Sequence, residues 1–189
     1  MKNQIHRIVA SILAGLMLLL PFPSQAEDAT LSNIIVTNTR DDLLLYLTVN
    51  NAFPAKIEEP ITSGVPAVFL FYINLYRVRN FWPDREIAET VVTHTIRYDS
   101  LKQEYTVTRS WEGNQPQIVK SFEEAKKLMT EIDSLTIVSL KKLEKGRQYQ
   151  IRAKAKLSRL KLPLYLHYVL FFVSIWDFET DWYTIDFIY

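Results

Sequence analysis

Two histidines, three pairs of neighbouring carboxylates and one alternating run of basic residues are the parts of this sequence that could do chemistry. Beyond the N-terminal segment the histidines are His94 and His167. His94 lies in a predicted strand and shares its face with apolar residues, namely Val92, Ile96 and Tyr98. A lone histidine on an apolar face is typical of a core position. His167 has no ionisable neighbour nearby in sequence, so neither histidine is predicted to bind a metal or to act in a catalytic triad.

The carboxylate pairs are Asp41-Asp42, Glu58-Glu59 and Glu123-Glu124. Glycoside hydrolysis needs two carboxyl groups about 5 to 9.5 Å apart across a cleft, and adjacent residues on a turn or a helix surface do not supply that geometry by themselves. The glycines are isolated, so there is no phosphate-binding loop, and no nucleophile elbow or zinc-binding helix motif occurs. We predict no catalytic residue. A hydrolase is the minor alternative, and it would require His94 or a carboxylate pair to line a cleft.

The basic run is the most distinctive charged feature. Residues 141–161 contain nine basic side chains and one acid, Glu144. A strand period of two places Arg152, Lys154 and Lys156 on one face, opposite Ile151, Ala153, Ala155 and Leu157. These three bases are either a solvated outer face paired with acids such as Asp181 and Asp186, or an anion-facing stripe. Beside an anionic membrane each base would contribute about 1 kcal/mol.

Residues 162–176 contain no charged side chain. As a helix the segment would be about 22 Å long, too short for a hydrocarbon core of about 30 Å. We predict a short helix or bent strand across one end of the fold, with core contacts from Val169, Phe172, Val173 and Trp176. The remainder, Tyr165, Leu166 and Leu170, is predicted to form an apolar contact patch for a partner or a membrane surface. Complete burial of the segment is the competing interpretation.

The first 26 residues have the pattern of a secretory signal peptide. Lys2 and Arg7 provide a basic start, residues 8–20 are apolar, and Ser24 and Ala26 are small residues at the cleavage-site positions. The apolar run is shorter than the ~20 residues that span a bilayer. We therefore expect cleavage after Ala26 and export to the periplasm.

Composition excludes further classes of function. The chain has 22 basic and 21 acidic residues, and only Lys2 and Arg7 precede the cleavage site, so the exported part has a formal charge of −1. Nucleic-acid-binding proteins usually carry a clear basic excess, so no nucleic-acid partner is expected. The absence of cysteine excludes disulfides and thiolate metal sites. We predict no metal site and no cofactor.

The exported part, residues 27–189, is predicted to be one mainly β domain, an antiparallel immunoglobulin-like β-sandwich with one or two short helices. Strands are expected at residues 34–39, 43–49, 66–79, 86–98, 104–111, 135–140, 148–157 and 182–189, the sixth and seventh forming a hairpin around Lys145-Gly146. One helix begins at a capping box, Ser121 and Glu124, and its apolar positions extend to Ile132. A weaker helix covers residues 54–63 and contains Pro60, so we expect it to be short or kinked.

The order of several motifs resembles a known bacterial family. Ser63-Gly64-Val65-Pro66 leads into a strand ending Leu75-Tyr76-Arg77-Val78-Arg79, with Trp82 beyond it. Tyr98-Asp99-Ser100-Leu101-Lys102-Gln103-Glu104-Tyr105, the helix at Phe122 and Leu157-Ser158-Arg159-Leu160-Lys161-Leu162-Pro163 follow in that order, and residues 176–182 precede the last strand. This arrangement resembles the exported-protein family called domain of unknown function 4390 over nearly the whole exported part. Pro60 departs from what the resemblance implies at its position.

The resemblance implies a small envelope protein of Gram-negative bacteria, without an established activity, cofactor or catalytic residue. Genes of such proteins lie near sensor kinases, which implies a link to envelope signalling and a sensor kinase as a possible partner. Together with the residues, it predicts a non-catalytic binding or regulatory module whose partner is an unknown envelope protein or the membrane surface. A carrier or sensor of an apolar ligand or lipid surface is the first alternative, since 13% of the residues are aromatic.

Overall fold

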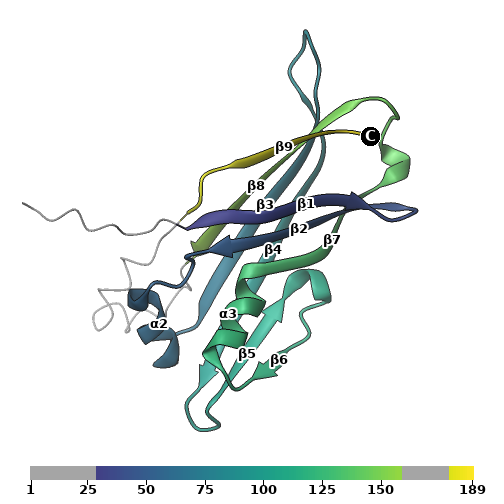
Figure 1. The fold of residues 1–189 in the computed structure, drawn as a ribbon. Coiled ribbons are helices and arrows are strands. Elements are labelled where there is room, and N and C mark those ends of the chain that lie inside the picture. Colours follow the sequence, from purple (N-terminus) through teal and green to yellow (C-terminus); the bar gives the residue numbers. More distant parts are fainter. Residues whose placement is uncertain (1–28, 159–178) are drawn as a thin grey trace, which may run out of the picture.

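The computed structural model describes residues 29–158 and 179–189, and the nine strands in these residues belong to two antiparallel sheets (Figure 1). Within these residues the larger sheet has six strands, in the spatial order β6 (Gln117–Val119), β5 (Glu104–Arg109), β4 (Arg85–Asp99), β3 (Ala67–Arg77), β8 (Gln148–Ser158) and β9 (Tyr183–Ile188). The smaller sheet has the order β1 (Thr30–Asn38), β2 (Asp42–Asn50) and β7 (Glu131–Ser139). The predicted mainly β, antiparallel class is confirmed.

The buried face of each sheet follows the two-residue period of its strands. Leu43, Leu45, Leu47 and Val49 of β2 are buried, and so are Ala67, Phe69, Phe71, Ile73 and Leu75 of β3. The alternate residues of β3 are half-buried because β4 and β8 flank this strand on both sides. Buried residues of both sheets and of both helices belong to one hydrophobic core.

Two helices complete the core. The α2 helix (Ala55–Thr62) buries Ile57 and Ile61, and Gly64 follows its end with a φ of 93°. Pro60 lies inside α2, which is short, as the sequence predicts. The α3 helix (Phe122–Thr130) lies over β5 and β4, beside the smaller sheet (Figure 1).

The end of α3 differs from the prediction. The Ser121 hydroxyl caps the helix by accepting a hydrogen bond from the N–H of Glu123, but the helix ends at Thr130 and Ile132 is buried in β7, paired with Leu47. Ile132 is spaced three residues from Met129, so helical periodicity includes it. Pairing with β2 makes it part of a strand instead.

The predicted hairpin around Lys145-Gly146 is wrong. β7 pairs with β2 in the smaller sheet, whereas β8 pairs with β3 and β9 in the larger one. The connection between them, which includes the 3-10 helix η2 (Leu140–Lys142), therefore crosses from one sheet to the other. Short strands joined by a glycine turn are compatible with either arrangement, and only the position of the partner strands distinguishes them.

The fifth predicted strand is also shorter than expected. β5 ends at Arg109, and Trp111 lies in the 3-10 helix η1 (Ser110–Glu112). Gly113, with a φ of 73°, ends η1 and lets the chain turn back into β6. This turn brings the Trp111 indole to His94.

Candidate functional site

The β3–β4 hairpin extends well beyond the end of the sheet (Figure 1). Its strands pair from Ala67↔Ile96 to Arg77↔Arg85, with one register shift between Leu75 and Tyr76, so the projecting loop is held by a long antiparallel ladder. At the tip of this loop the residues Phe81 and Trp82 are 93% and 74% exposed. Two large neighbouring aromatic side chains without cover are unusual on a soluble surface and indicate a contact site.

The charges around the tip are predominantly basic. Asp84, the acid of the loop, accepts hydrogen bonds from the backbone N–H of Arg79 at 3.3 Å and from Nη2 of Arg152 at 3.2 Å. Arg79 and Arg85 are exposed, and neither guanidinium has a hydrogen bond or an ion pair within the described residues. The tip therefore presents two aromatic side chains between two unpaired cations.

His94 is buried completely, as the prediction of a core position requires. Its Nε2 lies 3.0 Å from Nε1 of Trp111, and its Nδ1 lies 2.9 Å from the carbonyl oxygen of Met129. An indole N–H can only donate, so Nε2 accepts and the proton of the neutral ring resides on Nδ1, which donates to Met129. Both ring nitrogens are thus used in contacts that hold η1 and the end of α3 against β4.

The pKa of His94 follows from these surroundings. Burial lowers this pKa from 6.5 to about 4, the hydrogen bond to the Met129 carbonyl opposes the change, and the positive charge of Arg109 adds to it. Arg109 is itself nearly buried, 2.7 Å from Oε2 of Glu112 and with its guanidinium over the Trp111 ring. Glu112 Oε2 also accepts from the amide of Gln117 at 2.9 Å. The cluster connects β4, β5, η1 and β6.

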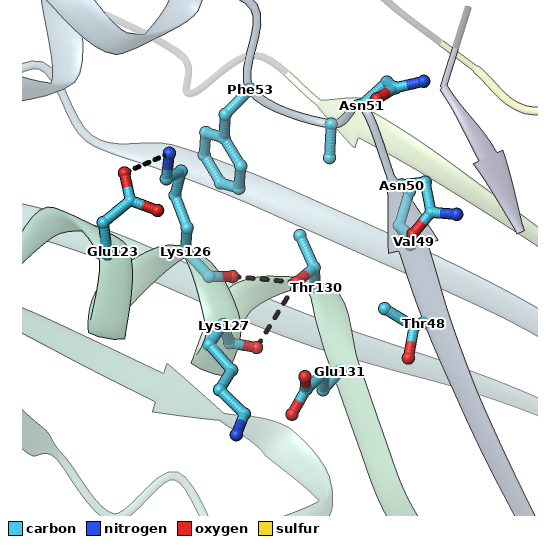
Figure 2. A pocket seen from close by; sticks show the side chains of 11 residues that line it. Thr48, Val49, Asn50, Asn51, Phe53, Glu123, Lys126, Lys127, Thr130 and Glu131 are labelled. Carbon is cyan, nitrogen blue, oxygen red and sulfur yellow. Dashed lines mark hydrogen bonds and ion pairs between the residues drawn. The ribbon is translucent and has the colours of Figure 1, made fainter. Parts of the chain in front are cut away.

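An open groove of about 670 Å³ lies between the end of β2 and α3 (Figure 2). Figure 2 shows the Glu123–Lys126 ion pair beside Phe53 at one end of the groove, and the Thr130 hydroxyl donating to the carbonyl oxygens of Lys126 and Lys127. Its lining is mostly polar and charged. Ligand pockets are usually apolar with a few polar groups, so this groove does not favour an apolar ligand.

The three carboxylate pairs lie apart on the surface. Asp41 and Asp42 form a turn in which both backbone N–H groups donate to the Thr39 hydroxyl. Glu58-Glu59 belongs to α2, and Glu123-Glu124 to the first turn of α3.

Nowhere in residues 29–158 and 179–189 do three or more metal-ligating side chains gather. Neither helix in these residues is long and apolar enough to cross a membrane.

The model of one protein family, described as domain of unknown function (DUF4390), matches residues 26–186. The chain belongs to the DUF4390 family. This match confirms the resemblance drawn from the motifs. Searches of curated proteins and of solved structures found no match.

The predicted basic stripe of this DUF4390 chain lies on the outer face of β8. Ile151, Ala153, Ala155 and Leu157 are buried and the three bases alternate with them, as predicted. The paired acids are different from the expected ones: Arg152 pairs with Asp84, and Lys154 and Lys156 both pair with Glu179. Asp186 accepts from the Gln150 amide instead. The prediction named Asp181 and Asp186, but the acids that reach the bases are Glu179, which precedes β9, and Asp84 in the β3–β4 loop.

The contact patch Tyr165, Leu166 and Leu170 lies outside the described residues, as do His167, the whole of residues 162–176 and the predicted signal peptide. The sequence prediction missed the exposed pair Phe81 and Trp82, because it placed no contact site between the predicted strands at residues 66–79 and 86–98. A signal was present. Two consecutive large aromatic residues in a turn between strands cannot both reach the core, and this alone predicts an exposed apolar tip.

Proposed function

We propose that this DUF4390 chain is an exported, periplasmic, non-catalytic binding module of the cell envelope. The observation that carries the proposal is the exposure of Phe81 and Trp82 at the end of a hairpin held by eleven paired residues of β3. A rigid support limits the ordering cost when an exposed side chain binds. The hairpin tip is the binding site in this proposal.

The periplasmic location rests on the signal-peptide pattern of residues 1–26. Intact mass of material from the periplasm tests it: a chain beginning at Glu27 is expected. A chain that retains Met1 and sediments with membranes would contradict both export and cleavage after Ala26.

A non-catalytic role is supported by how the candidate catalytic groups are used. Both ring nitrogens of His94 are engaged inside the core, and Glu112 is paired with Arg109. The carboxylate pairs belong to a turn and to helix surfaces. A link to envelope signalling, with a sensor kinase as the partner, is a further part of the proposal and comes from the family resemblance alone.

We also propose that the sandwich is immunoglobulin-like. Variable-type immunoglobulin domains have strands A, B, E and D in one sheet and G, F, C, C′ and C″ in the other. The order β1-β2-β7 corresponds to A-B-E, and β9-β8-β3-β4-β5 corresponds to G-F-C-C′-C″. β6 and α3 lie in the chain between C″ and E, where strand D would be.

A second feature supports the immunoglobulin-like assignment. Tyr149 is completely buried at the start of β8, and its hydroxyl accepts a hydrogen bond of 2.8 Å from the backbone N–H of Glu144. Immunoglobulin-like domains carry a tyrosine near the start of strand F whose hydroxyl bonds back to the backbone a few residues upstream. β8 is strand F in the order above.

The binding role is tested by a photo-crosslinking amino acid at position 82 in cells. The matched control is the same amino acid at position 101, because Leu101 is 95% exposed in the turn at the opposite end of β4. Crosslinks to an envelope component from position 82 and none from position 101 are expected. Equal labelling from both positions, or none, would reject the hairpin tip as the binding site.

A further inference from the structure

We propose that the hairpin tip docks on the surface of an anionic phospholipid bilayer, with Phe81 and Trp82 at the level of the lipid headgroups and Arg79 and Arg85 on lipid phosphates. This inference rests on the proposed binding function and names the partner of the same site. Its basis is the combination of exposed aromatic side chains, unpaired guanidinium groups and a projecting loop.

The aromatic side chains suit the membrane interface. Trp82 has an apolar ring and a polar N–H, and such amphipathic rings concentrate at the boundary between hydrocarbon and water. Neither its indole N–H nor the ring of Phe81 has a hydrogen bond or ring contact in the part of the chain that the structure describes. Pro83 restricts the backbone directly after them.

The charges of the tip without an ion pair in the described residues are two cations, Arg79 and Arg85, and one anion, Glu86. Asp84 is paired with the Arg152 guanidinium and accepts from the backbone of Arg79, whereas Glu86 has a 3.5 Å contact with the neutral Tyr76 hydroxyl and keeps its charge. The guanidinium groups of Arg79 and Arg85 remain available. Guanidinium binds phosphate oxygens in a bidentate manner, so two of them beside the aromatic pair match anionic headgroups.

The neighbouring surface has the same character. Arg77 pairs in register with Tyr149, and the N–H of Val78 donates to Gln148, so the connection from β7 to β8 lies at the base of the hairpin. This connection contributes the exposed Lys145, which has no ion pair in the described residues, while its acid Glu144 is paired with Arg77 and Arg147. Ile188, which pairs with Gln148, adds a further exposed apolar side chain at this end.

The size of the tip favours a bilayer over a folded protein. Two aromatic side chains bury about 150 to 250 Å² each, whereas a specific protein interface buries about 800 Å² on each partner. A narrow loop cannot provide that area by itself. A bilayer needs only shallow insertion of a few side chains together with attraction between charges.

The test is co-sedimentation of the exported chain with vesicles of phosphatidylethanolamine containing phosphatidylglycerol, compared with vesicles of phosphatidylcholine alone. We expect binding to the anionic vesicles that weakens as salt rises. The double variant Phe81→Ser/Trp82→Ser should weaken it by about tenfold, and Arg79→Gln or Arg85→Gln by about fivefold each. Leu101→Ser, matched in exposure at the far end of β4, should bind like the unchanged chain, and urea melts should show that all variants remain folded.

Insertion is measured separately by quenching of tryptophan fluorescence with brominated lipid. Quenching is expected in the unchanged chain and should largely disappear in Trp82→Phe, which keeps an aromatic ring and most of the affinity. Absence of binding to anionic vesicles, or quenching that persists in Trp82→Phe, would overturn the proposal. If position 82 crosslinks to a protein in cells while vesicles do not bind, the binding function stands and the lipid partner is wrong. If position 82 crosslinks to nothing in cells and the chain does not bind vesicles, the binding function and the lipid partner are both wrong.

Discussion

The indole N–H of Trp111 donates a 3.0 Å hydrogen bond to Nε2 of His94, a ring that has no exposed surface. Since that N–H can only donate, a proton on Nε2 would remove the hydrogen bond and place two donors against each other. Burial and this contact together keep His94 neutral. Its role is to hold η1 and the end of α3 on β4.

Folding stability should therefore depend on pH through His94. Its pKa is about 4 in the folded chain and 6.5 in the unfolded chain, so between these values the unfolded state binds more protons. The stabilisation is complete above pH 6.5 and is lost as pH falls toward 4. Between pH 7 and pH 5 the loss should be about 2 kcal/mol, measured as the free energy of unfolding in urea. The control is His94→Gln, which should lack this part of the pH dependence; an unchanged slope in that variant would exclude His94 as its source.

Removing the Trp111 donor should destabilise the fold and raise the pKa of His94. Trp111→Phe keeps a ring at the position but leaves Nε2 of a buried imidazole without a partner, at a cost of about 1 to 3 kcal/mol. Urea melts and an NMR titration of the imidazole give the two readouts. Trp182→Phe serves as the control, because the Trp182 ring contacts Lys154 and lies away from His94. Equal effects of the two changes would contradict a specific role for the Trp111–His94 bond.

The Tyr149 hydroxyl should contribute measurably to stability. Tyr149→Phe leaves the ring in the core but removes the acceptor of the Glu144 N–H, so a loss of about 1 to 2 kcal/mol is expected. Tyr105→Phe is a matched control, since Tyr105 is buried too and its hydroxyl makes no hydrogen bond within the described residues. The free energy of unfolding is measured for both variants. A cost for Tyr149→Phe no larger than for Tyr105→Phe would contradict a stabilising role of the hydrogen bond between Tyr149 and Glu144.

Two lysines on β8 should differ in their contribution. Lys154 and Lys156 share Glu179, but Lys154 is more buried, with 18% of its side chain exposed against 39%, and it lies over the Trp182 ring. Lys156→Gln should cost less than about 0.5 kcal/mol and Lys154→Gln about 1 kcal/mol or more. Urea melts at low and high salt measure both. A larger loss for Lys156→Gln would contradict the assignment.

Local patterns determined most of the secondary structure. The alternation in β2, β3 and β8 specifies which side chains enter the core, because a two-residue period leaves one face apolar. The Ser121 cap and the apolar positions of α3 specify where that helix begins. The core position of His94 followed in the same way from the residues that share its face. These features depend on neighbours in sequence, so the sequence alone contains the information.

Only the tertiary structure decided which distant segments meet. Long-range strand pairing decides whether β7 pairs with β8 or with β2. It also decides whether Ile132 belongs to α3 or to β7. The tautomer of His94 is determined by Trp111, which η1 brings to β4 by its turn at Gly113. The acids that pair with the β8 bases come from two loops and not from β9. Sequence spacing specifies a residue's face but not its partner, because the partner is selected by how the two sheets and their loops pack in space.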